Sequence, residues 1–197
     1  MNTYRRILLL CLTLLATTIC QAQDFRAGVE AARQGDYDTA YQIWSALAEG
    51  GDPASQFNLA MMYVRGEGLE RDLSMAAQWF RKAAEQDQVS AQARLGALYA
   101  HGQGVQQDFG EAAKWLFKAA RANDGPSQYD LAVLYANGSG VGQDYSEAYY
   151  WFTMSAINGF TPAQEAQKTL RQMLPPVQIG MVERRVQEEL GLVPQAR

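Results

Sequence analysis

Histidine and cysteine, which supply most metal sites and many catalytic nucleophiles, are almost missing from this 197-residue chain. His101 is the only histidine, so a site built from several histidine ligands is excluded. The motifs C-x-x-C, H-E-x-x-H, S-x-x-K and G-x-S-x-G do not occur. The sequence therefore predicts a protein that is not an enzyme, with no catalytic residues, no metal ligands and no cofactor-binding site.

The two cysteines, Cys11 and Cys20, lie in a segment with the pattern of a secretory signal peptide. Two arginines precede an apolar run from Ile7 to Ile19, which is shorter than the roughly 20 residues of a transmembrane helix. Cleavage after Ala22 would remove residues 1–22. We expect an exported protein, periplasmic or secreted, without stable membrane insertion. An uncleaved anchor and a lipoprotein modified at Cys20 are the alternatives.

Positive charge is also scarce in this chain. It has 17 basic and 21 acidic residues and a formal net charge of −4, and the charge becomes more negative when Arg5 and Arg6 leave with the signal peptide. An acidic protein is repelled by nucleic acid and by anionic membrane surfaces. We therefore expect no nucleic-acid partner. No low-complexity segment interrupts the chain, so one domain is the simplest organisation.

The chain does contain a unit that recurs every 36 residues between Asp52 and Gly159. A fixed period of this length predicts a solenoid of stacked repeats. Corresponding positions hold identical residues in all three copies: Tyr63, Tyr99 and Tyr135; Gly66, Gly102 and Gly138; Gly68, Gly104 and Gly140; Asp72, Asp108 and Asp144; Trp79, Trp115 and Trp151.

Each unit has the pattern of two helices joined by a glycine turn. Paired glycines such as Gly102 and Gly104 suit a turn in the left-handed conformation. Asp108, followed three residues later by Glu111, predicts a capping box at the start of the second helix. Small residues such as Gly96 would let the helices approach closely, and the tryptophans are predicted to fill the core.

The predicted organisation has four parts: a signal peptide at residues 1–22, a degenerate helix pair at 23–51, three repeats at 52–159 and a capping helix pair at 160–197. In the degenerate pair, Trp44 stands one position out of register with Trp79. In the capping pair, Thr161 is expected to begin a helix with another capping box. The last helix is expected to turn four apolar residues inward: Ile179, Val182, Val186 and Leu190.

This pattern resembles the Sel-one-like repeat, a longer-looped relative of the tetratricopeptide repeat. The resemblance is carried by Leu95-Gly96, Tyr99, Gly102-x-Gly104-Val105 and Asp108, followed by Ala112-Ala113-x-Trp115 and Lys118-Ala119-Ala120. It implies an all-α, right-handed solenoid of antiparallel helix pairs. It also implies an interaction scaffold, often in the bacterial envelope. Some cysteine-rich relatives are described as handling β-lactams, and this chain lacks their paired cysteines.

The first helix of each pair lines the concave face in such solenoids, which gives a candidate partner-binding set: Phe57, Met61, Arg65, His101, Tyr129, Val133 and Asn137. This mixture of aromatic, apolar and polar side chains suits a protein or peptide lying in a groove. Phe57 and Tyr129 fit core positions equally well. The favoured function is a scaffold for protein–protein interaction. The alternative is a hydrolase acting on β-lactams or cell-wall fragments.

Overall fold

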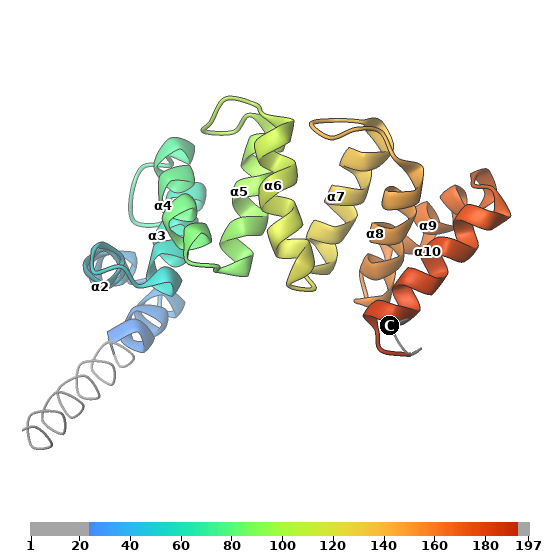
Figure 1. Ribbon diagram of the computed structural model, residues 1–197. Coiled ribbons are helices and arrows are strands. Elements are labelled where there is room, and N and C mark those ends of the chain that lie inside the picture. The colour runs from blue at the N-terminus through green and yellow to red at the C-terminus, as the bar shows by residue number, and fades with distance from the viewer. Residues whose placement is uncertain (1–23, 193–197) are drawn as a thin grey trace, which may run out of the picture. The chain divides into compact units, whose positions relative to one another are not determined.

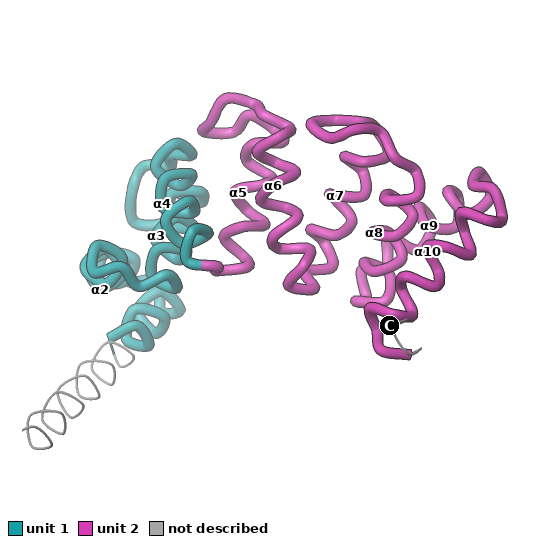
Figure 2. Tube along the Cα trace, viewed as in Figure 1, with its two compact units in different colours: residues 1–86 teal, residues 87–197 magenta. Residues whose placement is uncertain are grey.

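The computed structural model describes residues 24–192 (Figure 1), and the predicted signal peptide lies outside them. Within this range the chain forms helices joined by short loops and no strand, which confirms the all-α repeat solenoid. No helix in the described range is both long and apolar enough to span a bilayer. The chain divides into two compact units, residues 1–86 and 87–197 (Figure 2), which are described one at a time.

The first unit begins with a helical stretch over residues 24–33. It continues with α2 (Tyr37–Glu49), α3 (Pro53–Arg65) and α4 (Leu73–Glu85). Trp44 of α2 is buried with Ala31, Ala40 and Met62. Its structural counterpart is Phe80, 36 residues later and also buried, rather than Trp79. The degenerate pair therefore follows the repeat register, and the large aromatic fills the position that Phe80 fills in the next pair.

The second unit contains α5 (Val89–His101), α6 (Phe109–Arg121), α7 (Gly125–Asn137), α8 (Tyr145–Ile157), α9 (Pro162–Met173) and α10 (Pro176–Glu189). Each helix from α5 to α8 packs on the next one along the chain, and α10 packs on α8. A Cβ atom on Gly96 of α5 would lie 2.7 Å from Cγ of Leu116 on α6. This contact confirms that a missing side chain lets the paired helices approach closely.

The glycine turn has the predicted left-handed geometry but not the predicted capping box. Gly102 ends α5 with φ 65°, and Asp108 begins α6 by accepting hydrogen bonds from the N–H groups of Gly110 and Glu111. The N–H of Asp108 itself donates to the Tyr99 carbonyl oxygen at 3.0 Å. Because that single N–H is already used, Glu111 does not close the reciprocal half of a capping box. It accepts from Trp115 Nε1 at 3.1 Å instead.

Two expectations for the C-terminal pair are wrong. Thr161 lies in the right-handed helical region and makes no side-chain capping bond, because the Ala163 N–H donates to the Phe160 carbonyl oxygen and the turn begins one residue earlier. Leu190 is 42% exposed instead of facing inward, because it follows the last helical residue, where the chain turns away. The inward face of α10 is made by Val182 and Val186, as expected.

Candidate functional site

Three of the candidate partner-binding residues lie on α3 in the first unit. Phe57 is half-buried, and its ring centroid is 5.6 Å from that of the buried Phe80. Met61 is also half-buried. Arg65 is exposed at the end of the helix, with Nη1 3.5 Å from Glu67 Oε1. Phe57 therefore contributes to the core of this helix pair, and Arg65 is the most exposed of the three.

In the second unit the structure brings His101, Val133 and Asn137 together. They line a cavity of about 370 Å³ whose walls are α5 and α7 and whose floor is Leu116 of α6. We call this cavity the α5–α7 groove. The complete lining is Ala97, Ala100, His101, Gln107, Phe109, Leu116, Asp130, Val133, Leu134, Asn137 and Ser139.

The α5–α7 groove has an apolar interior and a polar rim. Alanines on α5 leave room, and Val133 and Leu134 on α7 provide the opposite apolar wall. These small and branched side chains can accommodate an inserted apolar group, while the polar rim can hydrogen-bond to a backbone. The arrangement fits a bound segment of polypeptide, with apolar contact in the middle and polar contacts at the edge.

Asp130 is a rim residue that the sequence reasoning missed. Desolvation by its surroundings raises the pKa of its carboxyl group, although the residue as a whole stays exposed to solvent. Smaller effects come from His101, which lowers this pKa, and Asp124, which raises it. The helical spacing of Asp130 with Val133 and Asn137 places all three on one helix face, but it does not show that the walls of the groove desolvate the Asp130 carboxylate.

Tyr129 does not line the α5–α7 groove. Its ring packs against Phe152 of α8 and Phe160, with centroid distances of 5.2 and 5.3 Å in edge-on geometry. The residue is half-buried there. Aromatic pairs at this separation contribute about 0.5–1.5 kcal/mol beyond burial. Tyr129 therefore holds α7 against α8, and truncating it would test packing together with any binding.

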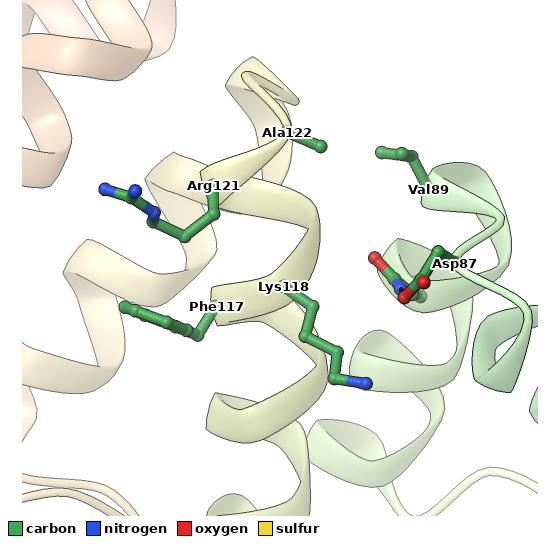
Figure 3. Close-up of a pocket in the computed structure, with 7 residues that line it drawn as sticks. Asp87, Val89, Phe117, Lys118, Arg121 and Ala122 are labelled. Carbon is green, nitrogen blue, oxygen red and sulfur yellow. Dashed lines mark hydrogen bonds between the residues drawn. The ribbon is translucent and has the colours of Figure 1, made fainter.

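A second hollow of about 390 Å³ lies between the start of α5 and the end of α6 (Figure 3). Figure 3 shows Phe117 and Arg121 on one side of α6 and Lys118 extending toward the side on which Asp87 lies. Both cations already have partners: Lys118 Nζ is 4.9 Å from the Trp115 ring, and Arg121 Nη1 is 3.0 Å from Glu189 Oε1. The charged side chains of this hollow are therefore less available to a ligand than those of the α5–α7 groove.

Between residues 24 and 192 no three histidine, cysteine, aspartate or glutamate side chains come together as a metal site would require.

The sequence model of the Sel1 repeat matches three consecutive segments, residues 53–88, 89–124 and 125–160, which make up more than half of the chain. The chain belongs to the Sel1 repeat family. Comparison with curated protein sequences gives no match. The Sel1 repeat is typically a non-catalytic scaffold, and this scaffold suggests protein–protein interaction.

Solved Sel1 repeat proteins resemble this chain in structure. A Sel1 repeat protein from Oxalobacter formigenes is 31% identical with a TM-score of 0.69, and the match covers 73% of this chain and 59% of that one. The protein c5321, a protective antigen present in uropathogenic Escherichia coli strains, is 26% identical with a TM-score of 0.59. That match covers 85% of this chain and 45% of c5321, so this chain spans only about half the length of these relatives.

Helicobacter pylori cysteine rich protein B shares the fold at 22% identity and a TM-score of 0.53, over 66% of this chain and 94% of its own length. In two of the three Sel1 repeats of the present chain, a buried glutamine ties neighbouring helices together. Gln56 Nε2 donates to the Ala48 carbonyl oxygen at 3.1 Å, and Gln128 Nε2 donates to the Ala120 carbonyl oxygen at 3.0 Å. These two buried polar side chains therefore have a structural role.

Proposed function

We propose that this Sel1 repeat protein is an exported adaptor that binds a segment of a partner protein in the α5–α7 groove. The observation that carries the proposal is the convergence of His101, Asp130, Val133 and Asn137 from α5 and α7 around one apolar cavity. A cavity of a few hundred cubic ångströms holds one or two side chains of a partner. The rest of the partner segment would lie along the rim.

The charge of the rim defines the chemistry of the partner segment. The Asp130 carboxylate is partly desolvated, and the charged groups that act on it are His101 and Asp124. A lysine or arginine of the partner would supply the missing positive charge, and its aliphatic stem would cover Val133. We therefore propose a partner segment that combines one small apolar side chain with one basic side chain. The net charge of −4 favours approach of such a segment.

The hydrolase alternative has no support among these comparisons. The similarity to Helicobacter pylori cysteine rich protein B, at 22% identity, shows the fold alone. The β-lactam chemistry was implied by cysteine-rich relatives, and the cysteines of this chain, Cys11 and Cys20, precede the described residues. A nitrocefin assay on the purified protein tests the alternative directly, and turnover above the buffer rate would support it.

The groove assignment is tested by measuring partner binding to matched variants. Crosslinking and affinity capture from periplasmic extract would first identify the partner, and titration calorimetry would then measure its binding. Asp130→Asn and Val133→Ala should each weaken binding at least about tenfold, which corresponds to about 1.4 kcal/mol. Glu165→Gln and Gln78→Ala change exposed polar residues that do not line the groove and should leave binding unchanged. Loss of binding in these controls, with the groove variants unaffected, would refute the assignment.

Export is tested separately by protein chemistry. The basic and then apolar start of the chain supports cleavage after Ala22, which gives a mature protein beginning at Gln23. N-terminal sequencing of the protein from the periplasmic fraction should read Gln23-Asp24-Phe25. An intact Met1 or a lipid on Cys20 would contradict the proposed processing.

A further inference from the structure

A further cavity of the second unit, with a volume of about 450 Å³, is lined by α6, α7 and the turn that follows α7. We call it the α6–turn pocket. Gly110 and Ala113 on α6 and Gly140 in the turn leave it open, because none of them has a side chain larger than a methyl group. The α6–turn pocket shares no lining residue with the α5–α7 groove. The two cavities are therefore separate sites on the same unit.

Phe117 gives the α6–turn pocket an exposed aromatic surface. The residue is 45% exposed, although its ring packs edge-on against Trp151 of α8 with a centroid distance of 5.8 Å. The contact with Trp151 holds the ring in one orientation. A ligand that covers the exposed part of Phe117 therefore loses little side-chain entropy on binding.

Lys114 and Lys118 place two ammonium groups at the same pocket, one helical turn apart on α6. Their Nζ atoms are 5.5 and 4.9 Å from the ring centroid of Trp115. Lys114 also pairs with Glu111 at 3.1 Å, whereas Lys118 forms no ion pair with any residue from 24 to 192. The Trp115 ring attracts and orients an ammonium group but carries no charge that neutralises it. The pocket therefore has a positive charge without a counter-ion.

The stacking of the repeats does not account for Lys114 and Phe117. The tryptophan of α6 recurs in every repeat, but these two residues do not. The corresponding positions of the other two repeats hold Gln78 and Tyr150 for Lys114, and Arg81 and Thr153 for Phe117. The fold thus forms with quite different side chains at both places, and the combination of a lysine and an exposed phenylalanine belongs to the middle repeat alone.

We propose that the α6–turn pocket binds an extended segment of a partner protein that carries an acidic side chain two positions from an aromatic one. The carboxylate pairs with Lys118 and Lys114, and the aromatic ring packs on Phe117 beside Gly110 and Gly140. Residues two positions apart in an extended segment point to the same side, about 6.7 Å from each other. One short segment can therefore make both contacts.

Charge selects a polypeptide as the occupant. A carboxylate supplies the counter-charge that Lys118 lacks and forms a charge-assisted hydrogen bond with its ammonium group. A nucleic acid is also anionic, but the net charge of −4 repels a polyanion far more than a single carboxylate. The segment proposed here is acidic, in contrast to the basic segment proposed for the α5–α7 groove, and neither proposal depends on the other.

Fluorescence polarisation with a defined peptide tests the proposal. The probe is a fluorescein-labelled peptide with a glutamate two positions before a tryptophan, and its control has glutamine in place of glutamate. The purified protein should bind the acidic peptide saturably, with a dissociation constant of about 1 mM or tighter. The glutamine peptide should bind at least about tenfold more weakly, because it brings no charge to Lys118.

Protein variants then locate the binding. Lys118→Gln and Phe117→Ser should each weaken binding of the acidic peptide at least about tenfold. Arg184→Gln is the matched control, because it also removes one exposed cation of the second unit, on α10, and should leave binding unchanged. Val133→Ala, in the α5–α7 groove, should also leave it unchanged. Melting temperatures show whether Phe117→Ser disturbs the contact with Trp151, and Lys118→Gln tests the site without touching that contact.

Four results overturn the proposal. The first is the absence of saturable binding up to about 1 mM, and the second is equal binding of the acidic and glutamine peptides. The third is a loss in Arg184→Gln as large as that in Lys118→Gln, which would reflect net charge rather than a site. The fourth is tighter binding of a short single-stranded DNA of equal charge, which would make the pocket a general anion site.

Discussion

At the residue scale, Gly140 is the position where the backbone leaves least room for any other side chain. Its φ is +69°, a conformation that costs roughly 1–2 kcal/mol for other residues. A Cβ atom there would lie 2.1 Å from the carbonyl carbon of Phe109, which is backbone and cannot rotate away. The positive φ belongs to the glycine turn itself, because the corresponding Gly104 also has a φ of 69°. The short Cβ distance comes from the close approach of the turn between α7 and α8 to the start of α6.

Gly140→Ala is therefore expected to lower the free energy of unfolding by at least about 2 kcal/mol. Gly142 in the same turn is the matched control, because a Cβ atom there meets nothing within 4 Å and its φ is not positive. Gly142→Ala should change stability by less than about 0.5 kcal/mol. Urea denaturation of both variants checks the prediction, and equal losses would show that the close approach to Phe109 is not rigid.

Asp130 is a residue whose place in the groove weakens the fold slightly. Its raised pKa means that the folded protein binds the proton more tightly than the unfolded chain does. The stability linked to Asp130 is therefore greatest below the ordinary pKa of 3.8 and is lost as pH rises through the raised folded-state pKa. Because the residue is exposed, solvent screening keeps this effect below about 1 kcal/mol.

Asp130→Asn should thus keep or slightly raise the melting temperature at neutral pH, and it should flatten the decline of stability just above pH 3.8. Thermal melts of both proteins across the acidic range measure this directly. A variant that binds the partner less well and yet is no less stable would assign Asp130 to binding. A clearly lower melting temperature at pH 7 would instead give Asp130 a structural role.

At the scale of the elements, the sequence predicts a side-chain cap at both Asp108 and Thr161, and the structure forms only the cap at Asp108. Asp108 accepts from two N–H groups at the start of α6, whereas Thr161 at the start of α9 accepts from none. Asp108→Ala should cost about 1 kcal/mol, the usual loss for a capping side chain, and Thr161→Ala should cost a few tenths at most. Chemical denaturation of the two variants tests this, and an equal cost would mean that Thr161 caps its helix in solution.

The sequence predicts the helix pairs well because the period repeats each local signal. Glycine turns and aspartate caps recur in register and support one another. The predicted core position holds for Trp115 and Trp151, which are 4% and 2% exposed, whereas Trp79 is only half-buried. Features without a repeat to support them were predicted less well. Thr161 has a capping sequence in a non-capping conformation, and Leu190 follows the last turn of its helix. Backbone direction decides both, and residue type alone does not.

The sequence predicts only part of the candidate site, because helical register carries less information than the packed structure does. Helical register indicates which residues share a face, and it brought His101, Val133 and Asn137 to one groove. It does not indicate which aromatic on that face turns toward the next helix, as Tyr129 does toward Phe152. It also gave no reason to select Asp130, because desolvation of a carboxylate depends on the surrounding walls.

At the scale of the whole molecule, the stack needs its last helices because α8 is buried on every side. Residues 148–155 of α8 are all buried, including Tyr149, Tyr150, Trp151 and Phe152. One face of α8 packs on α7, and α9 and α10 cover the others. A helix that is apolar all round is stable only when surrounded. We therefore expect α9 and α10 to stabilise the second unit by covering α8.

Deletion of residues 175–197 should expose this face of α8. It removes the buried Val182 and Val186 together with the Arg185 contacts to Glu147 and Tyr150. Two buried valines alone contribute about 3–6 kcal/mol, and for a chain of this size a loss of about 4 kcal/mol lowers the melting temperature by about 10 °C. Calorimetry of dilute samples should show at least this decrease, with a broader transition and stronger binding of a hydrophobic dye.

The matched control replaces Val177 and Met181 with serine, which changes the same helix on its exposed side only. Because those side chains are mostly exposed, at 74% and 68%, this control should melt as the wild type does. If the deletion and the control melt alike, α10 is not a cap, and the close contacts between α10 and α8 contribute little to the stability of the fold.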